Sequence, residues 1–433
     1  MKKISNRALS VLLIVALVVM GMAAYVLRYI DKGEEWALYF SRANSGSSGQ
    51  LLDKNGIILA SFDGLNELFS PDELTREANY HVTGDYWGRT GTGILSRYWN
   101  DVHGFSLLTG TTRTEDSVLT LNIDARLNNK IYETMGSQSS GAMLVCNYRT
   151  GELLGMVSTP SVDPMEADGQ LGEGAYINRC LSASFIPGSI FKLITAAAAI
   201  ECIPDIDSRS FYCEAEYEIA GVPVTCLREH YNQSFTEALA NSCNIAFAQL
   251  AVSLGQKNMI KYVKDYGLLS SQSLDGISTA AGSYPLDFVG DPELGWSGIG
   301  QSTDMVNPYS MLRFVAAIAN SGTVIEPSMI QGTQPRQTKL VKPETAAKLA
   351  EMMRFTAVEH YLSAETFPGL DICAKTGTAE LGDGTAHSWF VGFLQDEEHP
   401  YAFVTLIERG GYGITAAGSI TGQVLQWAVE NLE

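Results

Sequence analysis

Three short motifs in this sequence carry the residue types needed for acyl transfer to and from a serine. In chain order they are S-x-x-K at residues 189–192, S-x-N at 242–244 and K-T-G-T at 375–378. Each motif occurs by chance in many chains of 433 residues, but the ordered set is far more specific. Together the motifs predict a site in which an activated serine hydroxyl attacks a carbonyl carbon and forms an ester.

The first motif predicts a nucleophile and its base. Pro187 and Gly188 indicate a turn, and the apolar run at 190–200 predicts a buried helix, so Ser189 lies near a helix N-terminus. Lys192 follows three residues later and projects from the same helical face. A buried amine that has lost its proton can accept the hydroxyl proton, as in the Ser-Lys variant of the serine triad. The alternative is a capping serine followed by an unrelated surface lysine, and the other two motifs argue against it.

The second motif predicts a proton relay and a substrate-binding amide. The hydroxyl of Ser242 can pass a proton between Lys192 and the leaving or incoming amine. The side-chain amide of Asn244 can bind the substrate backbone. The alternative is an ordinary turn between helices, because Asn241, Ser242 and Asn244 are common turn residues.

The third motif predicts a substrate-binding strand. Residues 372–378 have the pattern of an edge strand, which can bind an extended peptide as an additional strand. Gly377 would allow close approach of that peptide, and Lys375 would supply positive potential. We expect the hydroxyls of Thr376 and Thr378 to bind a terminal carboxylate. The alternative interpretation of this motif is a strand-ending turn.

Six further segments strengthen the pattern. They are 51–60 (LLDKNGIILA), 120–128 (TLNIDARLN), 141–164 (GAMLVCNYRTGELLGMVSTPSVDP), 298–301 (GIGQ), 319–322 (ANSG) and 387–393 (HSWFVGF). With the three motifs, they make the chain similar to class B penicillin-binding proteins, which are monofunctional D,D-transpeptidases. The short N-terminal module, with HVTGDYWGRTGTGILSRYWN at 81–100, resembles the small actinobacterial or clostridial type.

The resemblance implies a two-step reaction on peptidoglycan stem peptides that needs no cofactor. Ser189 attacks the carbonyl of the penultimate D-alanine and expels the terminal D-alanine, and an amine of a neighbouring stem then attacks the acyl-enzyme. Backbone N–H groups of Ser189 and Thr378 would form the oxyanion hole. β-Lactam antibiotics would acylate Ser189, and a SEDS-family glycosyltransferase in the membrane would be the partner. The expected catalytic residues are Ser189, Lys192, Ser242, Asn244 and Lys375, and the expected substrate-binding residues are Thr376, Gly377 and Thr378.

Other activities remain open at this point. A D,D-carboxypeptidase would use the same residues and differ only in acceptor access. A class D-like β-lactamase shares the S-x-x-K and K-T-G motifs. Its S-x-V motif, however, is replaced by S-C-N in this sequence, and such an enzyme would not be expected to carry the N-terminal anchor and module. A β-lactam sensor would need further spanning helices and a cytoplasmic protease domain, and a pure scaffold would be expected to have lost part of the three motifs. No E-x-x-L-N string is present to activate a deacylating water.

The order of strand and helix patterns predicts an α+β fold. Strands are expected at 141–147, 152–158, 371–377, 387–394 and 400–408, and helices at 236–252, 306–320, 344–356 and 420–431. This order predicts an antiparallel sheet that is assembled from both ends of the segment and flanked by helices. Such a fold resembles that of the serine β-lactamases and transpeptidases.

The N-terminal third predicts a membrane anchor and a small mixed module. Residues 8–27 are mostly apolar and long enough to span a bilayer, and three basic residues precede them, so we expect a cytoplasmic N-terminus. Signal-peptide cleavage after Ala23 or Ala24 is the alternative. The expected division is a cytoplasmic tail (1–7), a transmembrane anchor (8–28), a membrane-proximal pedestal module (35–137) and an extracytoplasmic transpeptidase domain (138–433). A net charge of -19 argues against nucleic-acid binding.

Within the pedestal module, Asn55 and Gly56 indicate a hairpin, and residues 71–78 predict a short helix. Residues 84–93 predict a loop, although Tyr86 and Trp87 argue against a plain linker. Residues 45–49 (SGSSG) predict a short flexible stretch.

The seven cysteines include one pair of interest. Cys213 and Cys226 flank two short predicted strands around Ala220 and Gly221. An exported domain permits a disulfide between them, which would stabilise the fold by roughly 3 kcal/mol, and the sequence leaves open whether it forms. No C-x-x-C and no clustered histidines are present, which argues against a metal site.

Overall fold

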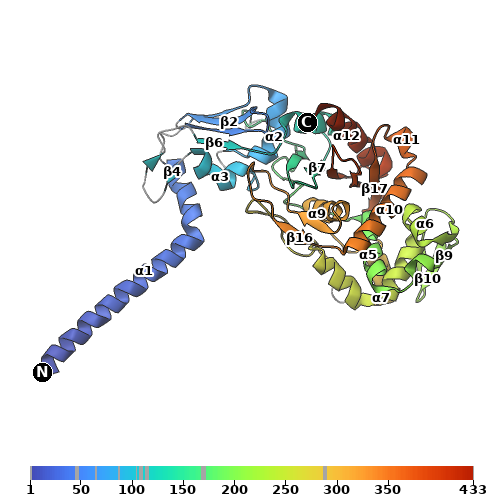
Figure 1. Ribbon diagram of the computed structural model, residues 1–433, viewed down its shortest axis with the longest axis horizontal. Helices are drawn as coiled ribbons and strands as arrows, with labels where there is room; N and C mark the ends of the chain where they lie inside the picture. Colours follow the sequence, from blue (N-terminus) through green and yellow to red (C-terminus); the bar gives the residue numbers. More distant parts are fainter. Residues whose placement is uncertain are drawn as a thin grey trace.

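A long N-terminal helix leads into a body that contains two larger sheets and the helices around them (Figure 1). The computed structural model describes residues 2–43, 48–63, 66–85, 88–103, 105–106, 111–112, 117–166, 172–285 and 290–432. Tyr86 and Trp87 of the expected loop, and residues 45–47 of the expected flexible stretch, lie outside the described residues. The N-terminus lies far from the body, whereas the C-terminus lies against it (Figure 1).

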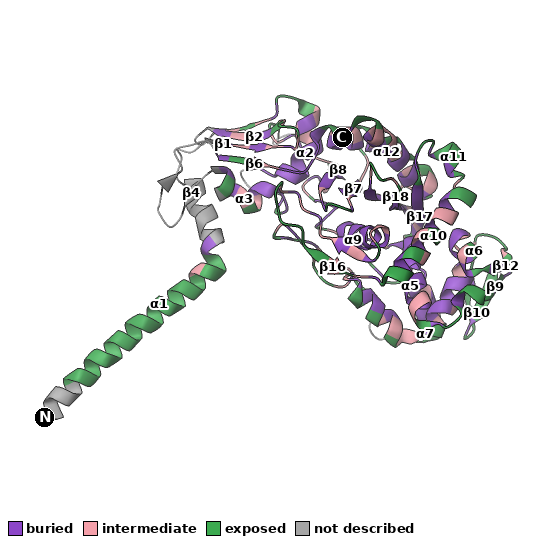
Figure 2. Ribbon diagram, viewed as in Figure 1, coloured by how far each residue is buried: buried purple, intermediate pink, exposed green. Residues whose placement is uncertain are grey.

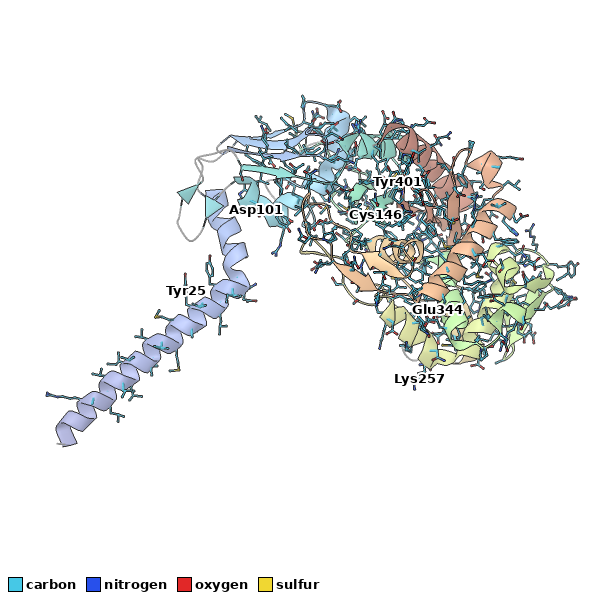
Figure 3. All side chains as sticks on the ribbon, viewed as in Figure 1. Tyr25, Asp101, Cys146, Lys257, Glu344 and Tyr401 are labelled. Atoms are coloured by element: carbon cyan, nitrogen blue, oxygen red, sulfur yellow. The ribbon has the colours of Figure 1, made fainter. Side chains whose placement is uncertain are left out.

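Helix α1 (Lys2–Ala43) contains a segment, Arg7–Gly33, that is long and apolar enough to cross a membrane. Among the described residues it is the one helix with this property, and it includes the expected anchor at 8–28. Its apolar side chains are exposed on all sides: Figure 2 colours most of this stretch green, and Tyr25 projects from the helix in Figure 3. A helix that is apolar all round suits contact with lipid.

A four-stranded sheet follows α1, with the strand order β3-β2-β1-β6. Its strands are β1 (Ser48–Leu52), β2 (Ile58–Asp63), β3 (Asn66–Phe69) and β6 (Ser117–Thr120). β1 and β2 are antiparallel, which confirms the hairpin expected at Asn55 and Gly56, and Gly56 adopts the positive φ of 83° that favours glycine. β1 and β6 pair in parallel, so the sheet is mixed.

Two helices accompany this sheet. Helix α2 (Glu73–Thr83) confirms the helix expected at 71–78, and it begins after Asp72, whose carboxylate accepts the Thr75 N–H at 2.9 Å. Helix α3 (Ile94–His103) is not anticipated by the sequence analysis. The short strands β4 (Phe105–Ser106) and β5 (Thr111–Thr112) form a separate pair.

The sheet that carries the K-T-G-T motif has five antiparallel strands in the order β17-β18-β19-β7-β8. The strands are β7 (Gly141–Asn147), β8 (Leu153–Thr159), β17 (Ile372–Glu380), β18 (Ala386–Leu394) and β19 (Tyr401–Ile407). All five expected strands and the antiparallel sheet built from both ends of the segment are therefore confirmed. β17 is an edge strand with a neighbouring strand, β18, on one side only, which is the position expected for a strand that binds a peptide.

Helices cover both faces of this sheet, and its strands alternate between two hydrophobic cores. Along β18, Trp389 belongs to one core and Phe390 to the other. Helices α5 (Lys192–Cys202) and α9 (Pro308–Ala319) contribute to the first core. Helices α4 (Ala125–Met135) and α12 (Ser419–Asn431) contribute to the second. The expected α+β fold is confirmed.

Helix α4 packs directly on β8. The Met156 N–H donates to Oδ1 of Asn128 at 3.0 Å, and a Cβ on Gly155 would lie 3.0 Å from Ile131 and 3.1 Å from Leu127. The expected module boundary near residue 137 therefore falls between two segments that share one hydrophobic core.

The described part of the chain contains further helices. They are η1 (Gly188–Phe191), η2 (Ile206–Ser208), α6 (Phe235–Ala240), α7 (Asn244–Asp265), α8 (Asp291–Ser297), α10 (Pro343–Glu359), α11 (Ser363–Thr366) and η3 (Ile414–Gly418). The helices expected at 306–320, 344–356 and 420–431 are confirmed by α9, α10 and α12. The single helix expected at 236–252 is wrong, because a turn at 241–243 divides it into α6 and α7.

Four short strands form a small module beside α6 and α7 (Figure 1). They are β9 (Ser210–Cys213), β10 (Glu216–Ile219), β11 (Val222–Thr225) and β12 (Tyr231–Ser234), paired as β9 with β12 and β10 with β11. The two short strands expected around Ala220 and Gly221 are confirmed. The other short pairs are β13 (Ser273–Leu274) with β14 (Ile277–Ser278) and β15 (Thr323–Ile325) with β16 (Gln337–Lys339).

Candidate active site

Ser189 and Lys192 lie where a 3-10 turn runs into helix α5. Ser189 is in η1, and Lys192 is the first residue of α5, which confirms the expected position near a helix N-terminus. Gly188 has a φ of 55°, and a Cβ at this position would lie 2.6 Å from the carbonyl oxygen of Thr378. Only glycine permits this turn to approach β17 so closely.

The side-chain amine of Lys192 is fully buried and surrounded by oxygens. Its Nζ lies 2.9 Å from Oγ of Ser189, 2.7 Å from the carbonyl oxygen of Ser242, 2.7 Å from Oδ1 of Asn244 and 3.1 Å from Oγ of Ser242. The carbonyl and amide oxygens can only accept hydrogen bonds. A neutral amine that donates its two N–H groups to them has its lone pair left for the hydroxyl of Ser189. The contacts therefore suit a general base.

The S-C-N motif forms the turn between α6 and α7. Ser242 has a φ of 53°, in the left-handed region, and Cys243 is the N-cap of α7. The side-chain Nδ2 of Asn244 donates to the carbonyl oxygen of Thr225 at 2.8 Å, which orients Oδ1 toward Lys192. The turn and the proposed chemistry are therefore compatible, since the turn directs Ser242 and Asn244 to the same amine.

Lys375 reaches the same group of side chains from β17. Its buried Nζ lies 3.0 Å from Oγ of Ser242 and 2.9 Å from the carbonyl oxygen of Thr376. Oγ of Ser242 consequently lies between the amines of Lys192 and Lys375. The structure thus brings together the five side chains that the sequence singled out as catalytic, from segments up to 186 residues apart.

The two lysines have unusual electrostatic surroundings. Burial lowers the pKa of Lys192 to about 8, and the nearby Cys226 and Cys243 act in the opposite direction. Burial, followed by the charge of Lys192, lowers the pKa of Lys375 well below its ordinary value. Two ammonium groups that contact one hydroxyl repel each other, so the pair releases its first proton more readily than an ordinary lysine does.

The reason for glycine at position 377 differs from the expected one. A Cβ at Gly377 would lie 2.8 Å from the carbonyl oxygen of Pro187 and 3.1 Å from Cβ of Trp389. The indole N–H of Trp389 also donates to the carbonyl oxygen of Ile186 at 2.9 Å. The close approach that Gly377 permits is therefore made by the turn that precedes Ser189, and not by a substrate backbone.

The hydroxyls of Thr376 and Thr378 both have partners inside the protein. Oγ1 of Thr376 lies 2.9 Å from the hydroxyl of Tyr361, which also accepts the Thr376 N–H at 2.9 Å. Oγ1 of Thr378 accepts the backbone N–H of Gly413 at 3.3 Å. When Tyr361 donates its proton to Thr376, each threonine keeps its own hydroxyl proton to donate, so these contacts do not prevent carboxylate binding.

Two positioning residues were not predicted for the site, although Gly300 lies in the GIGQ segment (298–301) of the family pattern. Tyr361 follows α10 in a segment without periodicity, and its pKa is raised to about 12 by burial. Gly300 has a φ of 77°, and a Cβ there would lie 2.2 Å from the carbonyl oxygen of Gly188. The Gly188 N–H donates to the Gly300 carbonyl oxygen at 2.9 Å. These contacts join distant segments, and therefore local periodicity does not reveal them.

All seven cysteines lie in the described part of the chain, and all are free thiols. The disulfide considered between Cys213 and Cys226 is therefore not formed. Instead Sγ of Cys213 lies 3.4 Å from Nδ1 of His230, and Sγ of Cys226 lies 3.7 Å from Sγ of Cys243. The sequence predicted no metal site, because it contains no C-x-x-C and no clustered histidines. In the fold, however, the donor atoms of these four side chains lie within 4.8 Å of one another.

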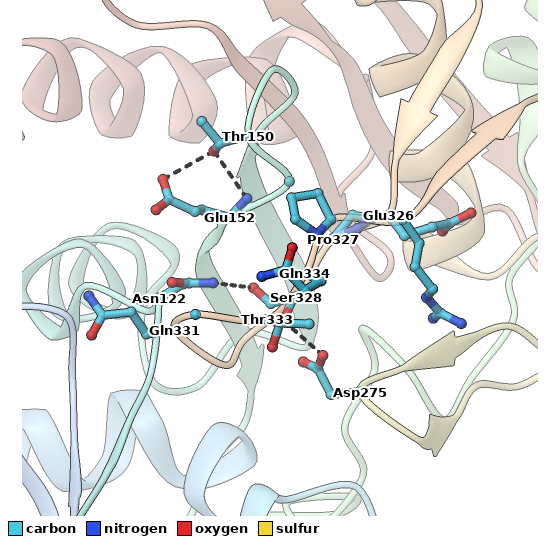
Figure 4. Close-up of a pocket in the computed structure, with 14 residues that line it drawn as sticks. Asn122, Thr150, Glu152, Asp275, Glu326, Pro327, Ser328, Gln331, Thr333 and Gln334 are labelled. Atoms are coloured by element: carbon cyan, nitrogen blue, oxygen red, sulfur yellow. Dashed lines mark hydrogen bonds between the residues drawn. The ribbon is translucent and has the colours of Figure 1, made fainter.

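A polar pocket of about 240 Å³ lies apart from these motifs (Figure 4). Its lining includes Asn122, whose Nδ2 donates to the carbonyl oxygen of Ser328 at 2.9 Å, and Asp275, whose Oδ1 accepts the Ser328 hydroxyl at 2.8 Å. None of the eight residues predicted for the site lines it. Asn122, Ser328 and Asp275 of its lining are therefore joined to one another by hydrogen bonds.

The antiparallel sheet covered by helices, with a serine and a lysine beside its edge strand, defines the fold class of the serine transpeptidases and β-lactamases. The family model described as "Penicillin binding protein transpeptidase domain" matches residues 141–426. The chain therefore belongs to the penicillin-binding protein transpeptidase family. The matched range contains all eight residues predicted for the site.

Two relatives place the chain among class B proteins. Stage V sporulation protein D of Bacillus subtilis is 29% identical over 315 residues, which cover 66% of this chain and 48% of that protein. Peptidoglycan D,D-transpeptidase PbpA of Mycobacterium tuberculosis is 27% identical over 348 residues, which cover 69% of each. The chain thus spans about half the length of the first relative and about two thirds of the second.

Solved structures have the same fold. The ceftriaxone acyl-enzyme complex of penicillin-binding protein A from M. tuberculosis superposes with a TM-score of 0.77 at 24% identity, covering 90% of this chain and 99% of that one. The D,D-transpeptidase domain of a peptidoglycan glycosyltransferase from Eggerthella lenta gives a TM-score of 0.77 at 21% identity, covering 89% and 99%. At these identities the likeness concerns the fold, and it agrees with the expected transpeptidase-like architecture.

Proposed function

We propose that this protein is a serine D,D-transpeptidase that crosslinks the stem peptides of peptidoglycan. In this proposal Ser189 is the nucleophile, Lys192 is its general base, and Ser242 relays protons. Asn244 and Lys375 hold and polarise the substrate. Thr376, Gly377 and Thr378 form the strand on which the stem peptide and its carboxylate bind.

The contacts of the Lys192 amine are the observation that carries the proposal. A buried amine 2.9 Å from a serine hydroxyl, with two obligate acceptors taking its N–H groups, is poised to accept the hydroxyl proton. A capping serine with a surface lysine would not require this burial. The lowered pKa of Lys192, about 8 because of burial, leaves a usable fraction of neutral amine near pH 7.

Acylation then follows from the positions of these groups. Oγ of Ser189 attacks the carbonyl carbon of the penultimate D-alanine while its proton moves to Nζ of Lys192. The negative charge on the carbonyl oxygen is stabilised by the backbone N–H groups of Ser189 and Thr378. The C–N bond breaks as the leaving D-alanine amine takes a proton through the hydroxyl of Ser242, which contacts both lysine amines.

Transfer reverses these proton movements. The acceptor amine attacks the ester carbonyl carbon and gives up a proton through Ser242 and Lys192, and Ser189 is released with its proton restored. The similarity to PbpA, a peptidoglycan D,D-transpeptidase, supports this activity. The acyl-enzyme complexes of the structural relative support β-lactam acylation of Ser189.

The location of the reaction is part of the proposal. With Lys2, Lys3 and Arg7 before the apolar segment of α1, the positive-inside rule favours a cytoplasmic N-terminus, a single span and an extracytoplasmic catalytic domain. We divide the chain into a tail (1–7), an anchor (8–28), a pedestal (35–137) and a transpeptidase domain (138–433). A SEDS-family glycosyltransferase in the membrane would contact the anchor and the pedestal.

Mass spectrometry of the full-length chain in detergent after brief exposure to a fluorescent penicillin tests the nucleophile. We expect one persistent adduct, on Ser189, which is lost in Ser189→Ala and kept in the control Ser182→Ala, whose side chain is exposed. An adduct on another residue would refute the assignment.

A second assay supplies stem peptides that end in D-Ala-D-Ala together with an acceptor amine. Release of D-alanine with crosslink formation supports the transpeptidase. Release without a crosslink would indicate a D,D-carboxypeptidase, and rapid turnover of the penicillin would indicate a β-lactamase.

A further inference from the structure

Four metal-binding side chains meet beside the S-C-N motif, although they are separated along the chain. Cys213 ends β9, Cys226 directly follows β11, His230 directly precedes β12, and Cys243 caps α7. We refer to them as the Cys3His cluster. We propose that the Cys3His cluster binds one structural zinc ion.

The distances within the cluster match those of a tetrahedral zinc site. With Zn–S bonds of about 2.3 Å and a Zn–N bond of about 2.0 Å, tetrahedral geometry places two ligand sulfurs about 3.8 Å apart and a sulfur and a nitrogen about 3.5 Å apart. The observed separations are 3.7 Å between the sulfurs of Cys226 and Cys243 and 3.4 Å between Sγ of Cys213 and Nδ1 of His230. The four donor atoms all lie within 4.8 Å of one another. The side chains therefore need little movement to enclose an ion.

The type and number of donors select zinc over other metals. Three thiolates and one imidazole form a complete tetrahedral ligand set, which is a common structural zinc site. Hard cations such as Mg²⁺ and Ca²⁺ prefer oxygen donors, and the cluster offers none. Because the protein supplies all four ligands, the ion would have no open position for substrate. The site is therefore structural and separate from the acyl-transfer chemistry.

Backbone N–H groups at the start of α7 point at two of the sulfurs. The Asn244 N–H donates to Sγ of Cys226 at 3.0 Å, and the Ala246 N–H donates to Sγ of Cys243 at 3.4 Å. Such hydrogen bonds and the positive end of the helix dipole favour a thiolate over a thiol. They are the kind of surrounding contacts that orient and tune metal ligands.

The strands around the Cys3His cluster have few other contacts that stabilise them. Strands β9 to β12 form only two-stranded sheets, and most of their residues are exposed. Their separate apolar cluster is small, with Ile219, Val224 and Ala248 as its buried members. Sheets of two strands are marginally stable without further support. An ion held by β9, the segment between β11 and β12, and α7 would join these strands to the rest of the domain.

The position of the cluster connects it with the active site. Cys243 is the middle residue of the S-C-N turn, and Cys226 bonds to the backbone of Asn244. Zinc bound here would therefore hold the turn that directs Ser242 and Asn244 toward Lys192. Removal of the ion is expected to slow Ser189 acylation without changing which residue is acylated.

Metal analysis of the full-length chain, purified in detergent under reducing conditions without chelators, tests the proposal. We expect about one zinc per chain, and less than a fifth of that in Cys213→Ser and in His230→Ala. These two variants leave the S-C-N motif intact. The control Cys202→Ser changes a cysteine outside the cluster and should keep the zinc. Cobalt substitution should give the intense visible bands of a tetrahedral site and a sulfur-to-cobalt charge-transfer band.

A measurement on the unaltered chain guards against variants that fail to fold. A thiol-specific reagent should react slowly with three cysteines and release zinc in proportion as they react. Reduced protein that takes up no zinc when zinc is supplied, or zinc content unchanged in both variants, would overturn the proposal. Peptide mapping that finds a disulfide within the cluster, for example between Cys226 and Cys243, would overturn it as well. Acylation of Ser189 is measured separately, so failure of this site leaves the proposed enzymatic activity intact.

Discussion

The pH dependence of Ser189 acylation follows from the burial of Lys192. The pKa of Lys192 is lowered to about 8 by burial, and only the neutral amine can accept the serine proton. At pH 7 roughly 10% of such an amine is neutral, compared with about 0.03% for an ordinary lysine. The acylation rate constant should therefore rise about tenfold from pH 7 to a plateau above pH 9.

Stopped-flow acylation by a fluorescent penicillin, at saturating antibiotic and constant ionic strength, measures this profile. His360, whose charge would act on Lys375, does not complicate this profile, because burial lowers the pKa of His360 below its ordinary value and keeps it neutral throughout this range. Lys192→Arg, which keeps a cation but removes the base, should abolish the rise along with nearly all acylation. A flat profile in the unaltered protein, or a rise that begins only above pH 10, would refute the assignment of Lys192 as the base.

Of three further predictions, two concern the surroundings of the site and one concerns the buried ion pair of Arg313 and Glu326. Gly188→Ala places a Cβ 2.6 Å from the Thr378 carbonyl oxygen at positive φ, so we expect acylation to fall about 100-fold and stability to fall by about 1–3 kcal/mol. The control Gly56→Ala has positive φ but open space, and equal acylation losses in both variants would contradict the steric argument. Tyr361→Phe removes the hydroxyl that holds Thr376, which should slow acylation about tenfold with little change in melting temperature. The control Tyr412→Phe, at an exposed position, should leave the acylation rate unchanged. An unchanged acylation rate in Tyr361→Phe would contradict the positioning role of Tyr361. Glu326→Ala leaves the buried Arg313 without its bidentate partner and should cost about 3–5 kcal/mol in urea unfolding, while Asp265→Ala breaks an exposed pair and should cost less than about 1 kcal/mol. Burial raises the pKa of Glu326, but the hydrogen bonds from Arg313 and Thr338 outweigh burial and lower this pKa overall. The stabilisation by the ion pair should therefore be lost as the pH falls below the ordinary glutamate pKa. A loss of stability on raising the pH instead would contradict this prediction.

Much of the central sheet was predictable because its strands are short, apolar and well separated by turns. The five expected strands agree with β7, β8, β17, β18 and β19 to within one or two residues at most ends. Helix α3 was missed, and one helix was expected where α6 and α7 are two. The S-C-N turn interrupts an apolar pattern whose periodicity continues on both sides, so periodicity alone does not locate the break.

The motif residues themselves were predictable because acyl transfer needs particular groups at particular spacings. The roles of their neighbours were not. Tyr361 and Gly300 act through contacts between distant segments. Gly377 was assigned to substrate approach, whereas its missing side chain makes room for the Pro187 carbonyl oxygen. A glycine in a strand indicates a close approach, but the sequence does not say which group approaches.

The sequence by itself determined which chemical groups are available for the proposed reaction, since residue type decides which groups donate, accept or attack. Its periodicity determined the class of fold and the apolar N-terminal segment. Only the tertiary structure decided that Ser242 lies between the amines of Lys192 and Lys375, and that three cysteines and a histidine from four separate segments meet. The physical reason is that local pattern encodes hydrogen bonding and burial along the chain, whereas a shared site depends on how distant elements pack on one another.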